Sequence, residues 1–261
     1  MSRLEAVFSA CRAESRAALI GYLPAGYPTL EGSKDVLRTM VSSGCDLVEV
    51  GLPFSDPVMD GVTIQRAAEQ ALRGGFRVRD LFGVVESVAA AGGRAVVMTY
   101  WNPVLAYGVD RFARDLAAAG GLGVITPDLV PDEGSEWIAA TDAHDLDRIF
   151  LVAPSSTEER IDLTARSSRG FLYATSVMGV TGARDVVSSA APALVKRVRE
   201  HTDMPIGVGL GVRNGAQAAE LAAFADGVIV GSAFVSAVQD DTVAALTEDL
   251  ATGVRQAAAA V

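Results

Sequence analysis

Residues 46–65 read DLVEVGLPFSDPVMDGVTIQ, and this stretch decides how the rest of the chain is interpreted. It begins as a short apolar strand that carries Glu49 near its end. A loop rich in Gly, Pro, Ser and Asp follows at once, holds Asp56 and Asp60, and leads through Gly61 into a helical pattern. A buried strand that ends in an acidic residue and opens into a long loop indicates a functional site rather than a purely structural role.

The same alternation of short apolar strand and helix runs through the whole chain. Eight such units in 261 residues predict a closed parallel barrel. We therefore expect a (β/α)8 TIM barrel of the α/β class, formed by residues 1–261 as one domain, with an extra N-terminal helix and inserted loop helices. The alternative is an open flavodoxin-like sheet, which would need fewer units and a second domain. The expected strands are 17–23, 46–50, 95–99, 122–125, 148–152, 171–175, 205–209 and 227–230. The expected helices are 2–14, 30–43, 63–72, 78–91 and 190–202, with others beginning at about Asp110, Asp132, Thr157, Asn214 and Ser232.

Composition excludes several classes of partner. The chain has 22 Lys and Arg against 32 Asp and Glu, a formal charge of −10, which argues against nucleic acid or an anionic membrane. A signal peptide and a membrane-spanning apolar run are not apparent, so we expect a soluble, cytoplasmic protein. Cys11, Cys45, His144 and His201 match no disulfide, metal or triad pattern, and no metal is expected.

Glu49 is the first candidate for acid/base chemistry. Strand side chains alternate, so Leu47 and Glu49 share one face. If Leu47 points into the barrel, Glu49 also does, near the top. A carboxyl group there loses water and its pKa rises, which suits a proton donor. The alternative is a structural ion pair with a buried cation, for which Arg148 is the candidate.

Three aspartates follow strands, and spacing leaves their roles open. Asp60 precedes a glycine at a helix start, so it is either catalytic or an N-cap. Asp56 lies in a Ser-Asp-Pro turn, where its side chain can bond to its own backbone. Asp128 follows the fourth strand and is either catalytic or a brace between loops.

Three late loops predict a phosphate site. The glycine-rich segments 179–182, 207–211 and 231–232 follow strands six, seven and eight. Backbone N–H groups and a helix N-terminus bind phosphate at this corner of many barrels. The residues thus predict an acid/base enzyme that acts on a phosphorylated, partly apolar small molecule. An aromatic pocket would come from Tyr22, Phe54, Tyr100 and Tyr173.

The stretch from Glu49 to Gln65 closely resembles the signature of the tryptophan synthase α subunit. Matches continue in order over almost the whole chain, at 21–28, 100–103, 127–128, 179–182 and 231–232. The resemblance implies a lyase of L-tryptophan biosynthesis, which cleaves indole-3-glycerol phosphate to indole and glyceraldehyde 3-phosphate by a retro-aldol reaction.

The resemblance also implies roles for individual residues. Glu49 matches the family's general acid/base, which protonates indole C3. Asp60 matches the carboxylate that holds the indole N–H and stabilises positive charge on the ring. Tyr173 matches a tyrosine near Glu49, and Thr181 belongs to the loop that covers the site. The matches to the phosphate binders are Gly182, Gly211, Gly231 and Ser232.

A partner is implied as well. Family members work with a pyridoxal-phosphate β subunit in an α2β2 tetramer and pass indole to it, so this chain itself is expected to hold no cofactor. Loops around residues 53–57 would meet the β subunit. Two alternatives stay open, a stand-alone lyase that releases free indole and a catalytically weak activating subunit. Val62 stands where proline is usual and Met59 where a small residue is common, which leaves the coupling to the partner open.

Overall fold

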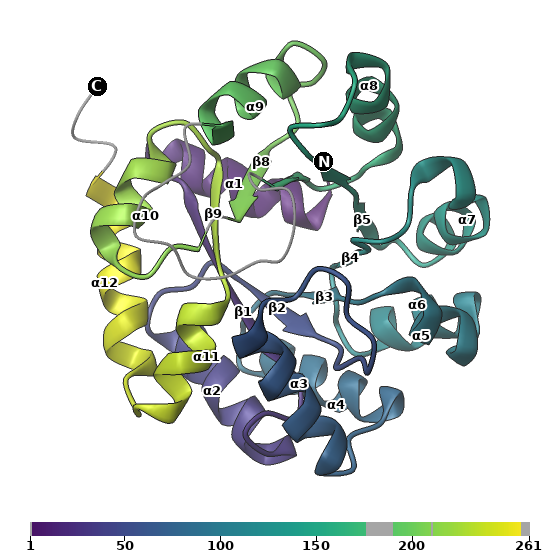
Figure 1. Ribbon diagram of the computed structural model, residues 1–261, viewed down its shortest axis with the longest axis vertical. Helices are drawn as coiled ribbons and strands as arrows, with labels where there is room; N and C mark the ends of the chain where they lie inside the picture. The colour runs from purple at the N-terminus through teal and green to yellow at the C-terminus, as the bar shows by residue number, and fades with distance from the viewer. Residues whose placement is uncertain (1, 176–189, 210, 257–261) are drawn as a thin grey trace.

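The computed structural model describes residues 2–175, 190–209 and 211–256. Their strands form one nine-stranded parallel sheet in the order β5-β4-β3-β2-β1-β9-β8-β7-β6, which curls into a nearly closed barrel (Figure 1). β5 and β6 are consecutive segments on either side of Phe150, and they pair with β4 and β7 respectively. The chain itself thus joins the two ends of the sheet, and the eight expected strand positions are all occupied. The strands are β1 (Ala18–Pro24), β2 (Leu47–Gly51), β3 (Ala95–Met98), β4 (Gly123–Ile125), β5 (Asp147–Ile149), β6 (Leu151–Val152), β7 (Leu172–Thr175), β8 (Ile206–Gly209) and β9 (Gly227–Val230).

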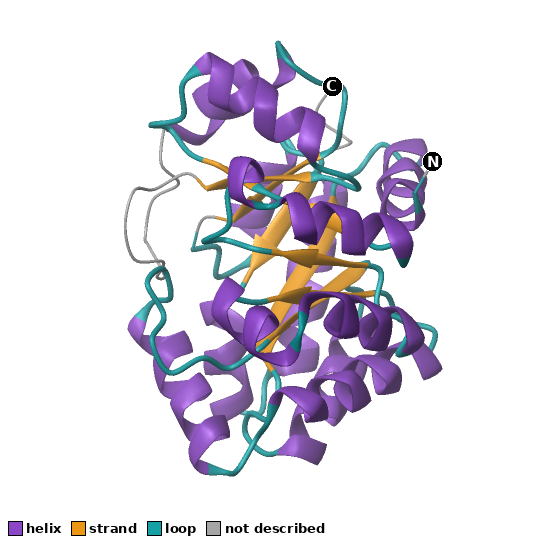
Figure 2. Ribbon diagram, turned by 90° about the vertical axis from the view of Figure 1, so that its right-hand side faces the viewer, coloured by secondary structure: helices purple, strands orange, loops and turns teal. Residues whose placement is uncertain are grey.

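Helices enclose the strands, as Figure 2 shows. The predicted TIM barrel is confirmed, including the extra N-terminal helix α1 and an inserted loop helix, since both α3 and α4 lie between β2 and β3. Within the described part of the chain, no helix combines the length and apolar character that crossing a membrane requires. The helices are α1 (Arg3–Ala13), α2 (Leu30–Ser42), α3 (Val62–Arg73), α4 (Val78–Ala90), α5 (Trp101–Tyr107), α6 (Val109–Ala118), the 3-10 turn η1 (Pro131–Glu133), α7 (Ser135–Ala143), α8 (Glu158–Ser167), α9 (Ala190–Arg199), α10 (Gly215–Ala222), α11 (Ser232–Gln239) and α12 (Val243–Gln256).

Two apolar layers hold the barrel together. One lies between the outer face of the sheet and the helices and includes Val48 and Val50. The other fills the barrel, includes Leu47, and is closed by α1, whose Phe8 ring lies 5.3 Å from that of Phe171. This division follows from the alternation of side chains along each strand. It also places Glu49, two residues after Leu47, on the interior side.

The helix starts expected at Thr157 and Asn214 and the helix expected at 30–43 are confirmed. Thr157 caps α8 by accepting a hydrogen bond from the backbone N–H of Arg160, and Asn214 caps α10 in the same way. Gly44 follows the C-cap of α2 with a φ of +124°, a conformation that glycine adopts without steric cost.

Other local predictions were wrong. The segment 101–107, which lies outside every expected helix, forms helix α5. Pro103 is tolerated because the N–H groups of a first turn need no helical partner. The expected strand 148–152 is interrupted at Phe150. The helix expected from about Asp132 starts as a 3-10 turn and becomes α-helical at Ser135. The terminal helix α12 was not predicted at all.

Candidate active site

Glu49 lies inside the barrel on β2 with only 1% of its surface exposed. Its Oε1 atom has no hydrogen-bond partner within the described residues, and no Lys or Arg among them forms an ion pair with it. Burial raises the pKa of Glu49 to about 8. Arg148, the candidate cation, instead donates to the Ser167 carbonyl oxygen at 2.6 Å and to Asp142 at 2.5 Å. Glu49 therefore forms no ion pair with Arg148 or with any other basic side chain that the structure describes, and the structural ion-pair interpretation is wrong for these residues.

Asp60 is held by a tyrosine that lies two residues after the end of β3, the strand next to β2. Its carboxylate accepts a hydrogen bond from the hydroxyl of Tyr100, whose oxygen also accepts the backbone N–H of Met59 at 3.0 Å. The N-cap of α3 is Gly61, without a side-chain cap, so the N-cap interpretation of Asp60 is wrong. Burial raises the pKa of Asp60 to about 6, and the hydrogen bond from Tyr100 opposes this rise.

Tyr22 on β1 and Tyr173 on β7 complete an aromatic wall around the two carboxylates. Burial raises the pKa of both phenols well above the usual value, and the negative charges of Glu49 and Asp60 raise it further. Each phenol is therefore close enough to both carboxylates to respond to their charges. The four side chains therefore border one space at the C-terminal end of the barrel, the end at which TIM-barrel enzymes carry their sites.

Two glycines make room for these tyrosines: Gly51, which sequence reasoning missed, and Gly209, which was expected only as part of a phosphate loop. A Cβ atom at Gly51 would collide with the hydroxyl of Tyr22, and one at Gly209 would collide with the hydroxyl of Tyr173. Both glycines lie at strand ends, in β2 and β8. The available signal was strand alternation, since Gly51 shares the inward face of Glu49 two residues earlier.

The remaining aspartates lie outside this space. Asp56 is exposed and accepts a hydrogen bond from the Ser55 hydroxyl at 2.6 Å, as its turn sequence predicts. Asp128 accepts the backbone N–H of Trp101 with both carboxylate oxygens, at 2.9 and 3.2 Å. It braces two loops, one of the two roles considered for it.

The glycine-rich loops follow neighbouring strands. β8 pairs with β9, so the loops that carry Gly211 and Gly231 leave the barrel side by side. Gly211 has a φ of +60°, and Gly231 is the N-cap residue of α11, which Ser232 begins. The first N–H groups of a helix lack partners within it and can bind an anion. Thr181 and Gly182 lie outside the described residues.

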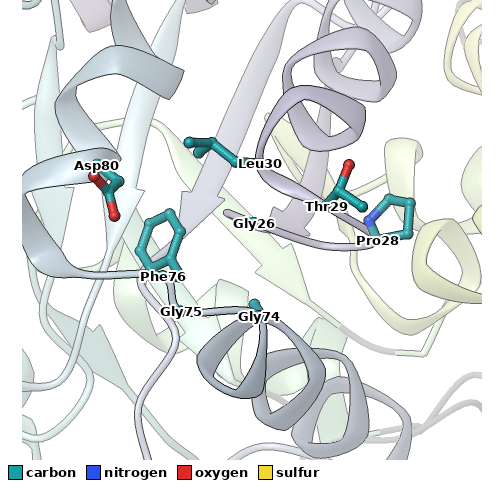
Figure 3. A pocket seen from close by; sticks show the side chains of 9 residues that line it. Gly26, Pro28, Thr29, Leu30, Gly74, Gly75, Phe76 and Asp80 are labelled. Atoms are coloured by element: carbon teal, nitrogen blue, oxygen red, sulfur yellow. The ribbon is translucent and has the colours of Figure 1, made fainter.

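A separate pocket of about 170 Å³ lies between the loop after β1 and the adjoining ends of α3 and α4 (Figure 3). Its polar side chains are bound within the protein. Thr29 accepts the N–H of Gly32 at 3.0 Å, and Asp80 accepts the N–H of Arg77 at 2.8 Å. It shares no residue with the space around Glu49. Its lining is Gly26, Pro28, Thr29, Leu30, Ala71, Gly74, Gly75, Phe76 and Asp80.

Metal ligands do not gather in the described ranges, where no group of three His, Cys, Asp or Glu side chains is placed to hold an ion. The site offers two carboxyl groups with raised pKa values, a wall of phenols and a pair of glycine-rich loops. Such a set can protonate and deprotonate an apolar ring while the loops hold an anionic group.

Comparisons with known proteins agree over nearly the full length. A family model described as tryptophan synthase alpha chain matches residues 8–260. The tryptophan synthase alpha chain of Nocardia farcinica is 70% identical over 261 residues, which cover 99% of this chain and 98% of that protein. The one from Mycobacterium avium is 66% identical over 262 residues, covering 99% and 97%.

Solved structures give the same result. A structure of Mycobacterium tuberculosis tryptophan synthase matches with a TM-score of 0.95 at 64% identity, covering 97% of this chain and 98% of that chain. Another structure of that enzyme, in its aminoacrylate-bound form, matches with a TM-score of 0.92 at 61% identity, covering 97% and 100%.

Proposed function

The chain belongs to the tryptophan synthase α chain family, and from this premise we propose that Glu49 and Asp60 divide its reaction between them. The reaction is the lyase cleavage of indole-3-glycerol phosphate to indole and glyceraldehyde 3-phosphate. One observation carries the proposal. Glu49 is buried inside the barrel with Oε1 unpartnered among the described residues, so its carboxyl group is free to exchange a proton with a substrate.

Glu49 acts on carbon. With a pKa of about 8 it is protonated at neutral pH and can donate its proton to C3 of the indole ring. The ring then carries positive charge on nitrogen. When the bond between C3 and the glycerol carbon breaks, its electron pair returns to the ring and the carbon becomes an aldehyde. The hydroxyl proton released in this step needs a base, and the ionised Glu49 carboxylate is in place to accept it.

Asp60 acts on nitrogen. With a pKa of about 6 it is mostly ionised at neutral pH, while Glu49 stays protonated. An anionic carboxylate near the indole N–H stabilises the positive charge that develops once C3 is protonated. Such a fixed charge in a site shielded from water contributes more than it would in solution. The two carboxyl groups thus hold opposite protonation states at one pH, which separates their roles.

The other proposed site residues bind the substrate. Tyr22, Tyr100 and Tyr173 line the space for the indole ring, because their side chains surround the two carboxylates. Gly211, Gly231 and Ser232 bind the phosphate through backbone N–H groups, supported by the pairing of β8 with β9 and by the N-terminus of α11. We assign Thr181 and Gly182 to the same end of the substrate on the family motif alone.

A β subunit is the proposed partner. Val58 and Val62 are 69% and 57% exposed, and Leu105 and Val130 are exposed as well. They lie in or just after the loops that follow β2, β3 and β4, which are neighbours in the sheet. Exposed apolar side chains gathered at one edge mark an interaction surface. We propose that a β subunit binds here in an α2β2 tetramer, that it holds the pyridoxal phosphate, that this chain holds no cofactor, and that the complex works in the cytoplasm.

The test is a cleavage assay on the purified full chain, alone and with a β subunit, using Glu49→Gln. The amide keeps the shape of the side chain but cannot exchange a proton, so we expect substrate binding to persist and cleavage to fall by at least about a hundredfold. Glu86→Gln, an exposed change on α4, is the matched control. Substantial turnover by Glu49→Gln would remove Glu49 from the central role, and full turnover by the wild-type chain alone would argue against dependence on a partner.

A further inference from the structure

The loop that carries Asp60 is fastened to Tyr100 at both of its ends. Near its start, the ring of Phe54 lies 5.3 Å from the ring of Tyr100. Near its end, the Tyr100 hydroxyl accepts the N–H of Met59 at 3.0 Å and donates to the carboxylate of Asp60. The position of Asp60 therefore depends on where Tyr100 is held.

Tyr100 is also the N-cap residue of α5, but its side chain contacts the loop and does not cap the helix. The cap comes from Asp128, in the loop after β4. Both of its carboxylate oxygens accept the N–H of Trp101, at 2.9 and 3.2 Å. A carboxylate at a helix N-terminus is favoured by the helix dipole and forms strong hydrogen bonds. The residue next to Tyr100 is thus anchored by a side chain from another loop.

The side chain and the backbone of Trp101 are held by different contacts. The indole ring of Trp101 packs edge-on against that of the buried Trp137, with the ring centroids 5.6 Å apart. The hydrogen bonds from Trp101 N to Asp128 fix the backbone beside Tyr100. Asp128 itself is exposed, and its charge is not among the causes that shift the pKa of Glu49 or of Asp60.

We propose that Asp128 is a positioning residue for the cleavage reaction: it fixes the start of α5 and, through Tyr100, sets Asp60 against the indole nitrogen. The inference rests on the role proposed above for Asp60. It predicts that a side chain outside the substrate space controls the rate of the chemical step.

The first test is Asp128→Ala in the full chain. We expect kcat for cleavage to fall about tenfold with little change in KM, because small displacements of a group that acts in the transition state cost rate. Asp128→Asn keeps an oxygen that can accept the N–H of Trp101 and should restore most of the rate. Thr157→Ala removes the N-cap of α8, a helix without any proposed site residue, and should cost about 1 kcal/mol of stability with kcat unchanged.

The second test asks whether Asp128 acts through Tyr100. Tyr100→Phe removes the hydroxyl and keeps the ring. In that background Asp128→Ala should lower kcat by much less than tenfold, because residues that act through one contact are not additive.

The pH profile gives an independent readout. Both single variants should move the acid limb of kcat/KM to higher pH, because the hydrogen bond from Tyr100 lowers the pKa of Asp60. The other ionisable side chains around Asp60 in the described chain are Glu49, Tyr22 and Tyr173. The phenols stay neutral over this range because their pKa values are raised, and Glu49 governs the basic limb.

Three results would overturn the inference: an unchanged kcat in Asp128→Ala, fully multiplicative effects in the double variant, or a defect that appears only when the β subunit is present. The last would make Asp128 a partner contact. Near-normal cleavage by Asp60→Asn would instead overturn the proposed role of Asp60, so the two failures are distinguishable.

Discussion

The hydroxyl of Tyr22 lies against the Cα atom of Gly51, so that a methyl group at residue 51 would occupy the space of the phenol. Tyr22 belongs to β1 and Gly51 to β2, the adjacent strand, whose Glu49 is the proposed acid. The absence of a side chain at residue 51 thus determines where an aromatic ring of the substrate space lies.

Gly51→Ala tests this relationship. The added methyl group must displace Tyr22, so we expect kcat/KM for cleavage to fall about tenfold or more and unfolding free energy to drop by about 1–3 kcal/mol. Gly83→Ala is the control, because a Cβ atom at Gly83 in α4 meets nothing within 4 Å. That change should be neutral or stabilising. Equal effects of the two substitutions on activity would contradict the prediction.

Asp60→Asn tests whether the negative charge of Asp60, rather than the shape of its side chain, is needed for cleavage. The amide can still accept a hydrogen bond from Tyr100 but carries no negative charge, so we expect kcat to fall by about a hundredfold while KM changes little. Steady-state cleavage assays check this. Asp56→Asn, in the same loop but exposed and bonded to Ser55, should leave cleavage by the chain alone near normal.

Cleavage should follow a bell-shaped pH profile. Asp60 must be ionised and Glu49 protonated, so kcat/KM should rise through about pH 6 and fall through about pH 8. The residual cleavage rate of Glu49→Gln, measured against pH, should not fall at the basic end of the profile. If wild-type activity were flat between pH 5 and 9, the assignment of both groups would fail.

The free energy of unfolding should decrease as pH rises, because the pKa of Glu49 is higher in the folded chain than in the unfolded chain. The pKa of Glu49 is raised from 4.5 to about 8, so between these values the folded chain holds a proton that the unfolded chain has released. Stability therefore decreases as pH rises through this window, by up to about 1.4 kcal/mol per pH unit. Glu49→Gln removes this dependence, and denaturant unfolding should find it more stable than the wild type at pH 8, by on the order of a few kcal/mol. A wild-type advantage at pH 8 would show that Glu49 ionises without cost in the folded chain.

The partner surface can be tested without touching the substrate space. Val130→Asp places a charge among the exposed apolar residues and should weaken binding of the β subunit at least about tenfold, with cleavage by the chain alone unchanged. Leu30→Asp alters an exposed apolar residue on α2 and should leave binding intact. Titration calorimetry with the β subunit compares the two.

Local patterns predicted a large part of the fold and of the candidate site. The face of β2 on which Glu49 lies follows from side-chain alternation, and the caps at Thr157 and Asn214 follow from residue type and position. Helix α5 was not expected, because the carboxylate that caps it comes from Asp128, in a different loop.

What the sequence by itself determined was most of the strands and helices, their alternation along the chain, which predicts a barrel, and the inward direction of Glu49. Each of these follows from patterns that the sequence shows directly. Only the tertiary structure decided that Tyr100 holds Asp60, that Asp128 caps the helix beside Tyr100, and that no basic side chain in the described residues pairs with Glu49. These features depend on which loops meet above the barrel. Hydrogen bonding and desolvation act over a few ångströms in space, whatever the separation along the chain.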